Sequence, residues 1–446
     1  MSKYIPNTGQ QQREMLEELS LHSVDELFAD IPEDIRFKGD LKLPDAMSEI
    51  ELVKHMEELA GKNKNLDENT CFLGAGAYDH YIPGIISHIT SRQEFYTAYT
   101  PYQPEISQGT LQAIYEYQTM ICELTGMHIS NVSMYDGATA LAEAASIACL
   151  ATGRREVIVA GTVHPESRAV LNTYSRFKGN GIIEVGYSDG KIDKDELGKK
   201  ISGSTAAVIV QNPNFFGIIE NLTGFAEMIH SRRALFIVSV DPISLGILKP
   251  PGEYGADIVV GEGQSMGNHL SFGGPYLGFF AATGELMRKM PGRIVGQTTD
   301  RNNRRGFVLT IQTREQHIRR EKATSNICSN QALNALAAAV YMSVMGKQGM
   351  KEVAELCLQK AHYAYSKLIE SGKFKPVFSA PFFKEFIVKS LTPVEELNGK
   401  LLKDRIIGGY QIDRDYPELA DGWLIAVTEK RTRAEMDRLV EKAAAI

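Results

Sequence analysis

Three groups of chemically useful residues fall where predicted strands end or a predicted helix begins. A capping aspartate precedes Gly137, Ala138 and Thr139 at the start of an alanine-rich helix, and such a helix start can bind a phosphate through its free N–H groups. His164 follows one predicted strand, and Asp241 ends another. An aspartate in this place could pair with a protonated pyridine nitrogen, while an imidazole could stack on the ring. Together these residues predict the architecture of a pyridoxal-phosphate site, whereas the helix start alone is explained by ordinary capping.

The lysine that such a site requires is missing. Pyridoxal-phosphate enzymes hold the cofactor through a lysine amine, normally after the strand that follows the aspartate. No lysine occurs between Lys249 and Lys289, and Gln264 occupies the loop where it is expected. Because an amide cannot bond to the cofactor's aldehyde as an amine does, we expect no cofactor bound covalently to this chain.

Residues 263–267 match the G-x-S-x-G pattern of serine hydrolases around Ser265. That pattern requires a strand before the serine and a helix after it. A strand is predicted before the serine, but residues 268–275 are rich in glycine and end in proline, so they cannot begin a helix. A hydrolase is therefore the weaker alternative, beside an independent enzyme of the pyridoxal-phosphate class.

The composition narrows the class of protein. The chain has 446 residues, 43% of them hydrophobic, with 48 basic residues, 55 acidic residues and a net charge of -7. This charge gives no general attraction to nucleic acid or to anionic membrane surfaces. The first thirty residues are acidic and lack a long apolar stretch, so we expect neither a secretion signal nor a membrane span.

Cysteine and histidine usage gives no sign of a metal site. The five cysteines form no C-x-x-C pair, and the ten histidines show no pair at helical spacing. Thiolate zinc sites and disulfide frameworks both need more regular spacing. We therefore expect no metal, no disulfide framework and a reducing, cytoplasmic location.

The elements that must position these residues alternate between buried strands and helical connections. Residues 167–177 and 223–233 are typical of helices between strands. Strand, crossover and strand in succession predict an α/β fold with a mostly parallel sheet covered on both faces. The predicted strands are residues 156–161, 181–187, 205–211, 234–241, 257–260 and 277–282.

Helices and a second α+β unit flank this sheet. Thr8 with Gln11, and Ser23 with Glu26, match the spacing of a capping box, so two short helices should open the chain. A long alanine-rich helix begins near residue 330 and should break at glycines 346 and 349. We expect an N-terminal helical arm over 1–65, a large α/β domain over 66–330, and a linking helix with a small α+β domain over 331–446.

Two segments have unusual compositions. Residues 95–109 combine four aromatic residues with two prolines, and tyrosines at this density suit an interface or a pocket wall as well as a packed loop. Residues 301–322 hold seven arginines and lysines against two glutamates. A solvated basic face is the simple interpretation, and docking of an acidic partner is the alternative.

Four segments together resemble a known family. Residues 98–109, 135–140, 211–214 and 313–328 are similar to the N-terminal half of glycine decarboxylase, the P protein of the glycine cleavage system. The resemblance runs essentially from end to end. The family includes single long chains and pairs of homologous subunits, and both the length and the lysine-free loop resemble subunit 1 of the split form.

The resemblance implies a type I aminotransferase-like fold and an oxidoreductase of glycine catabolism that assembles as a heterotetramer. It also implies that subunit 2 carries the lysine for pyridoxal phosphate, at about the position of Gln264. Glycine would be decarboxylated there, and the aminomethyl group would pass to the lipoyl arm of the H protein, which is generally acidic in this family. Candidates for an interface pocket are Tyr99, Tyr102 and Tyr135. Candidates for loop anchoring or partner docking are Arg304, Arg305, Arg314, His317, Arg319 and Arg320.

Overall fold

The computed structural model describes residues 7–446, which form two units, one ending at Lys64 and one over Asn65–Ile446. The first unit contains α1 (Gly9–Glu18), a 3-10 helix (Val24–Phe28) and α2 (Glu49–Ala60). Thr8 caps α1 in the predicted capping box. The capping box predicted at Ser23 is wrong, because the Ser23 hydroxyl donates to the Glu26 side chain and accepts no backbone N–H. The helix that follows it is the short 3-10 helix.

A seven-stranded sheet forms the centre of the second unit, in the order β2-β10-β9-β8-β7-β3-β4. Strands β9, β8, β7, β3 and β4 run parallel to one another, while β10 runs antiparallel to β9 and β2. The predicted α/β class and all six predicted strands are confirmed. The strands are β2 (Ile129–Ser130), β3 (Glu156–Ala160), β4 (Gly181–Val185), β7 (Thr205–Asn212), β8 (Leu235–Val240), β9 (Ile258–Glu262) and β10 (Gly278–Ala282).

Helix α6 (Gly137–Thr152) covers the centre of this sheet and packs against β7, β8, β9 and β10. Asp136 caps its start in a complete capping box, and Gly153 ends it in the left-handed conformation at φ 70°. Small alanines let the helix approach the strands closely, so nine of its residues are buried. The other helices before residue 300 are α3 (Gly84–Thr90), α4 (Gln93–Tyr96), α5 (Gln108–Thr125), α7 (Pro165–Lys178), α8 (Lys194–Lys200) and α9 (Phe225–His230).

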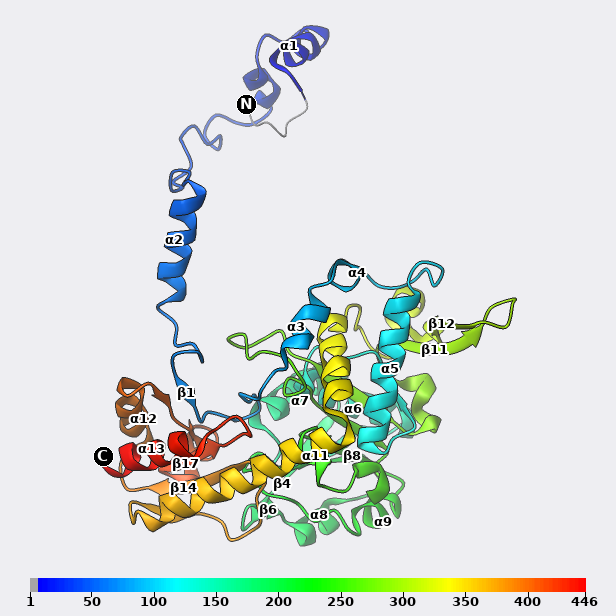
Figure 1. The fold of residues 1–446 in the computed structure, drawn as a ribbon. Helices are drawn as coiled ribbons and strands as arrows, with labels where there is room; N and C mark the ends of the chain where they lie inside the picture. The colour runs from blue at the N-terminus through cyan, green and yellow to red at the C-terminus, as the bar shows by residue number, and fades with distance from the viewer. Residues whose placement is uncertain (1–6) are drawn as a thin grey trace. The chain divides into compact units, whose positions relative to one another are not determined.

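A long helix, α11 (Ala332–Glu370), links the large sheet to the C-terminal part of the chain (Figure 1). It is interrupted at Gly346, whose φ of 60° and ψ of -177° are not helical. The predicted break at Gly346 is therefore confirmed, but the predicted break at Gly349 is wrong, because the helix has already resumed there.

The C-terminal part is a four-stranded sheet in the order β13-β14-β17-β16, with a separate core around Trp423 and Phe386. A further short strand, β15 (Ile406–Ile407), pairs with β1 (Thr70–Cys71), so both ends of the second unit meet. The other elements of the C-terminal part are β13 (Phe374–Pro376), β14 (Glu385–Ser390), β16 (Tyr410–Gln411), β17 (Gly422–Ala426), α12 (Val394–Lys403) and α13 (Arg433–Ala444).

Two hairpins complete the fold. Strands β11 (Ile294–Thr299) and β12 (Arg305–Thr310) form the larger one, which α10 (Gln316–Arg319) follows. Strands β5 (Tyr187–Ser188) and β6 (Lys191–Ile192) form the smaller one. Over residues 7–446, no helix is both long enough and apolar enough to cross a membrane.

Candidate functional site

A cavity of about 410 Å3 lies at the carboxyl ends of β3 and β8, beside the start of α6. Gly137, Ala138, His164 and Asp241 all line it, and ligands of open α/β sheets bind in crevices of this kind. Thr139 is different, because its N–H donates to the capping aspartate at 2.7 Å and its side chain lines another cavity. The structure thus brings together four of the five residues predicted for a vestigial cofactor site.

His164 forms one wall of this cavity and is fully hydrogen-bonded. Its Nε2 lies 2.9 Å from the Ala75 carbonyl oxygen, and its Nδ1 accepts from the Glu166 N–H at 3.1 Å. Since a carbonyl oxygen only accepts, Nε2 carries the hydrogen. Burial lowers the pKa of His164, which keeps the ring neutral at pH 7.

Glu262, the last residue of β9, closes the start of α6. One carboxylate oxygen accepts from the Gly137 N–H at 2.9 Å, while the other accepts from the N–H groups of Gln264 at 3.0 Å and Leu277 at 2.9 Å. Burial raises the pKa of Glu262 to about 7, against the opposite effect of these three donors. A carboxyl group of the chain therefore already uses a backbone donor at this helix start.

Lys384 contacts two residues that line the cavity, Asp241 and Tyr78. Its Nζ lies 2.6 Å from Oδ2 of Asp241 and 3.5 Å from the centre of the Tyr78 ring. The lysine side chain is only 2% exposed, and a buried ammonium is tolerated only where it is paired. The other oxygen of Asp241 accepts from the Ile243 N–H at 3.0 Å. The aspartate predicted to pair with a pyridine nitrogen is thus paired with a cation of its own chain.

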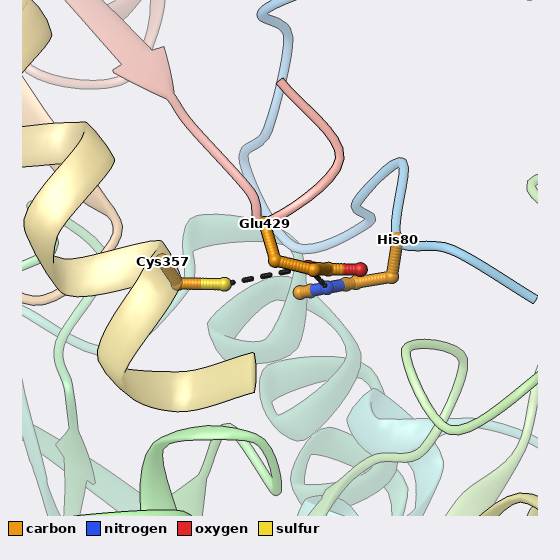
Figure 2. A group of neighbouring side chains, drawn as sticks. All are labelled: His80, Cys357 and Glu429. Atoms are coloured by element: carbon orange, nitrogen blue, oxygen red, sulfur yellow. Dashed lines mark hydrogen bonds and ion pairs between the residues drawn. The ribbon is translucent and has the colours of Figure 1, made fainter. Parts of the chain in front are cut away.

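A buried group of His80, Cys357 and Glu429 supports this lysine (Figure 2). Nε2 of His80 lies 3.0 Å from the Lys384 Nζ, and because an ammonium only donates, Nε2 accepts and Nδ1 donates to Glu429 at 2.6 Å. The Cys357 thiol donates to the same carboxylate at 3.4 Å, and burial raises the pKa of this thiol well above its usual value.

Although these three side chains could in principle hold a metal ion, their geometry is that of a hydrogen-bonded network. Both nitrogens of His80 are in use, and the ammonium of Lys384 lies beside the imidazole. Burial favours the uncharged thiol of Cys357, whereas a metal ligand must be a thiolate. The absence of a metal site stays a prediction, and the role that these contacts support is to hold Lys384 in place.

Glu385, the first residue of β14, anchors the same segment. Its carboxylate accepts from the Tyr78 hydroxyl at 2.6 Å and from the Ala75 N–H at 2.7 Å. Burial raises the pKa of Glu385 to about 7. Lys384 and Glu385 together tie the C-terminal sheet to the chain segment between β1 and α3.

Gln264 stands in the loop after β9, where a lysine was expected from the chemistry, and it is bonded to backbone groups. Its Oε1 accepts from the Tyr78 N–H at 3.0 Å, and its Nε2 donates to the carbonyl oxygens of Tyr78 at 3.2 Å and Asn268 at 2.7 Å. The adjacent Ser265 is 3% exposed, so its hydroxyl is closed to a substrate. The structure therefore gives no support to a serine hydrolase.

The three candidate tyrosines lie in different settings. Tyr99 is 83% exposed and lines a cleft of about 250 Å3 that Arg293 also lines. The Tyr102 hydroxyl accepts from Nη2 of Arg293 at 2.9 Å. Tyr135 lines a separate cavity beside α6, and its hydroxyl accepts from the Cys328 N–H at 3.4 Å. Arg293 thus connects two of the tyrosines, and the third is separate from them.

The basic segment is not one continuous face. Arg304 and Arg305 are exposed at the tip of the β11–β12 hairpin, whereas Arg314 is buried and donates to the Met290 carbonyl oxygen. Nε of Arg319 donates to the Thr313 carbonyl oxygen at 3.0 Å. These contacts favour loop anchoring for Arg314 and Arg319 and leave the hairpin tip available for docking.

The remaining two docking candidates, His317 and Arg320, follow Arg314. His317 Nδ1 lies 3.7 Å from the Glu315 carboxylate. Arg320 is exposed and has a φ of 50°, a conformation that is uncommon for a residue with a side chain.

The cavity is a poor match for pyridoxal phosphate. The side chains that line it include four carboxyl groups and no lysine or arginine, so a phosphate would meet repulsion. Gly137 and Asp241, which would receive the two charged ends of the cofactor, already have partners within the chain.

Sequence reasoning did not find Glu262 and Lys384. A signal for Lys384 exists, because a lysine and a glutamate interrupt the apolar run Phe-Phe-Lys-Glu-Phe-Ile-Val at residues 382–388. A charged pair inside a buried apolar run needs partners, and that rule could have marked Lys384 and Glu385.

Comparison with known proteins agrees with this architecture. The probable glycine dehydrogenase (decarboxylating) subunit 1 of Carboxydothermus hydrogenoformans is 60% identical over 439 residues, 98% of each chain. The subunit of the same description from Bacillus cytotoxicus is 56% identical over the full length of both chains. A crystal structure of glycine decarboxylase (P-protein) of the glycine cleavage system, in inhibitor-bound form, superposes over both whole chains with a TM-score of 0.90 and 41% identity.

More distant structures show the fold alone. An alanine–glyoxylate aminotransferase from Nostoc sp. gives a TM-score of 0.61 at 13% identity, covering 85% of this chain and 95% of that one. The predicted type I aminotransferase-like fold is thereby confirmed. The model of the family described as glycine cleavage system P-protein matches residues 2–442, and the chain therefore belongs to that family.

Proposed function

We propose that this chain is subunit 1 of a two-subunit glycine dehydrogenase (decarboxylating), and that the partner, subunit 2, holds pyridoxal phosphate covalently. The observation that carries this proposal is the loop after β9, where Gln264 stands at the place in which a lysine is expected and is hydrogen-bonded to Tyr78. The curated relatives are named subunit 1, which supports a partner subunit.

In the assembled complex, pyridoxal phosphate would supply a ring that accepts the negative charge left when glycine loses carbon dioxide. This chain would shape the partner's pocket with the tyrosine-rich segment and would help to receive the lipoylated H protein. The five free thiols support a reducing, cytoplasmic location.

The full chain is incubated with pyridoxal phosphate and reduced with borohydride. We expect that no single lysine then carries the pyridoxyl label at a stoichiometry close to one per chain. Lys384 contacts Asp241, which lines the cavity, but its ammonium is bound to that carboxylate, and an ammonium is not a nucleophile. Peptide mapping checks this, with subunit 2 as the positive control. A stoichiometric label on Lys384, or on any other single lysine, would overturn the proposal. Labelling of Ser265 by a fluorophosphonate would instead restore the hydrolase alternative.

The hairpin tip is our candidate for docking of the H protein. Charge reversal of the exposed Arg304 and Arg305 (Arg304→Glu with Arg305→Glu) should slow aminomethyl transfer more at low salt than at high salt, because salt screens steering of an acidic partner. The matched control is Lys373→Glu with Lys375→Glu, two exposed lysines at β13 in the C-terminal sheet. Equal kinetics of the two double variants at every ionic strength would leave the hairpin a structural role only.

A further inference from the structure

We propose that the cavity between α6 and β8 is a former cofactor site, and that two charged side chains of this chain now pair with the groups that would have received the two charged ends of the cofactor. The Lys384 ammonium takes the place of a protonated ring nitrogen on Asp241, and the Glu262 carboxyl group takes the place of a phosphate at the start of α6. These internal groups exclude the cofactor and bind the C-terminal sheet to the large sheet. The inference rests on the proposed function in one respect, namely that subunit 2 and not this chain holds the cofactor.

The first substitution follows from the contacts of Asp241. A carboxylate at the carboxyl end of β8 needs a cationic partner when it faces a pyridoxal ring. Here Nζ of Lys384 supplies that partner at 2.6 Å, from a residue that precedes β14 by one position. His80 accepts a second hydrogen bond from the same ammonium at 3.0 Å, and the Tyr78 ring covers it at 3.5 Å.

This cation is held from three sides. His80 is itself fixed by Glu429, as Figure 2 shows, and Glu429 also accepts from the Tyr81 N–H at 2.7 Å. Although burial raises its pKa, the electrostatic interaction with His80 and the hydrogen bonds from His80 and the Tyr81 N–H hold the pKa of Glu429 below the usual range. A preorganised ligand set of this kind is expected for a built-in cation rather than for a lysine that reaches a cavity by chance.

The second substitution follows from the contacts of Glu262. A helix start binds phosphate through its first N–H groups, and here the first of them, on Gly137, donates to the Glu262 carboxylate at 2.9 Å. The same carboxylate bridges to the loop after β9 and to the residue before β10. A phosphate could reach Gly137 only by displacing a side chain that three backbone donors hold.

Both substitutions connect distant parts of the chain. Lys384 and Glu385 bring the start of β14, in the C-terminal sheet, against Asp241 and Tyr78. A bound cofactor would hold such groups together only while it is present, whereas covalently attached side chains hold them permanently. The expected consequence is a stability that does not depend on pyridoxal phosphate.

A double-mutant cycle on the full chain tests the cation. Lys384→Met removes the charge at similar size and leaves the half-buried Asp241 carboxylate without its cation, so Tm should fall by about 5 °C. Asp241→Asn alone should also lower Tm, because it leaves the ammonium unpaired. The variant with both changes should recover more than half of the Lys384→Met loss. A Lys384→Met chain that folds only with Asp241→Asn would support the proposal equally; a double variant no better than Lys384→Met would contradict it.

Inorganic phosphate tests the other end. Glu262→Ala frees the Gly137 N–H, so Tm of this variant should rise by about 1–2 °C at a phosphate concentration ten times Kd, relative to chloride at equal ionic strength. The control Glu262→Gln keeps the space filled and should show no rise, like the unaltered chain. A rise of the same size in the unaltered chain would overturn the proposal.

The outcomes separate this inference from the proposed function. Additive effects in the cycle, with no phosphate effect in Glu262→Ala, would end the inference and leave the role as partner subunit intact. Pyridoxal phosphate attached covalently to the unaltered chain would end the proposed function, whatever the cycle shows.

Discussion

Replacing Tyr102 by phenylalanine should slow glycine decarboxylation by the assembled complex roughly ten- to hundred-fold. The Tyr102 hydroxyl accepts from Nη2 of Arg293 at 2.9 Å, and Arg293 is 7% exposed. Phenylalanine keeps the ring but leaves a nearly buried guanidinium donor without its acceptor, which costs about 1–3 kcal/mol. Because Arg293 lines the cleft beside the tyrosine-rich segment, we expect this cost to appear in the pocket that the two subunits form together.

The matched control is Tyr96→Phe, since Tyr96 lines the same cleft and is 69% exposed. It removes one tyrosine hydroxyl at the cleft and leaves the Tyr102–Arg293 hydrogen bond in place. Size-exclusion chromatography should show intact assembly for both variants, and steady-state decarboxylation should fall for Tyr102→Phe alone. Equal rates for the two variants would make Tyr102 a packing residue.

The second large effect is expected when the partner is withheld. The chain alone should release no carbon dioxide from glycine above background, with or without added pyridoxal phosphate. Gln264 cannot bind the cofactor covalently, and the cavity offers a phosphate four carboxyl groups, no lysine or arginine, and an occupied helix start. Labelled carbon dioxide released from carboxyl-labelled glycine measures this. Activity of the chain alone that depends on pyridoxal phosphate would show that the cavity is a working site.

The large sheet and the position of the site could be predicted from the sequence. Its strands are continuous buried runs, such as β7 around Val208 and β8 around Ile237. Such runs are apolar throughout because both faces of the sheet are covered, and this makes them recognisable in the sequence. His164 and Asp241 line the same cavity because the carboxyl ends of parallel strands lie at one edge of the sheet. The start of α6 could be predicted from its capping aspartate.

The groups that fill the site could not be placed in this way. Lys384 meets Asp241 across 143 positions of the chain (384 less 241), and local patterns carry no information about such a pairing. The predicted strand ends at residue 260, whereas β9 continues to Glu262. The prediction therefore left Glu262 outside the strand. In both cases the partner is fixed by tertiary packing, which local sequence signals do not describe.

Some local signals were present but were not used correctly. Ser48 and Glu51 form a complete capping box for α2, a helix that was not predicted. Ser23 and Glu26 have the same spacing but bond through their side chains, without the serine-to-backbone bond that starts a helix. The spacing is thus a necessary part of the motif, and the residues that follow decide whether a helix forms.

Titration of this chain into a fixed amount of pyridoxal-phosphate-loaded subunit 2 tests the central claim most directly. The rate of glycine decarboxylation should rise from background with each addition and reach a plateau near one chain of each kind, because neither subunit alone completes the pocket. Borohydride mapping of the mixture at the plateau should place the cofactor on subunit 2 only. Full activity of subunit 2 before any addition, or a cofactor-bearing lysine in this chain, would contradict the account.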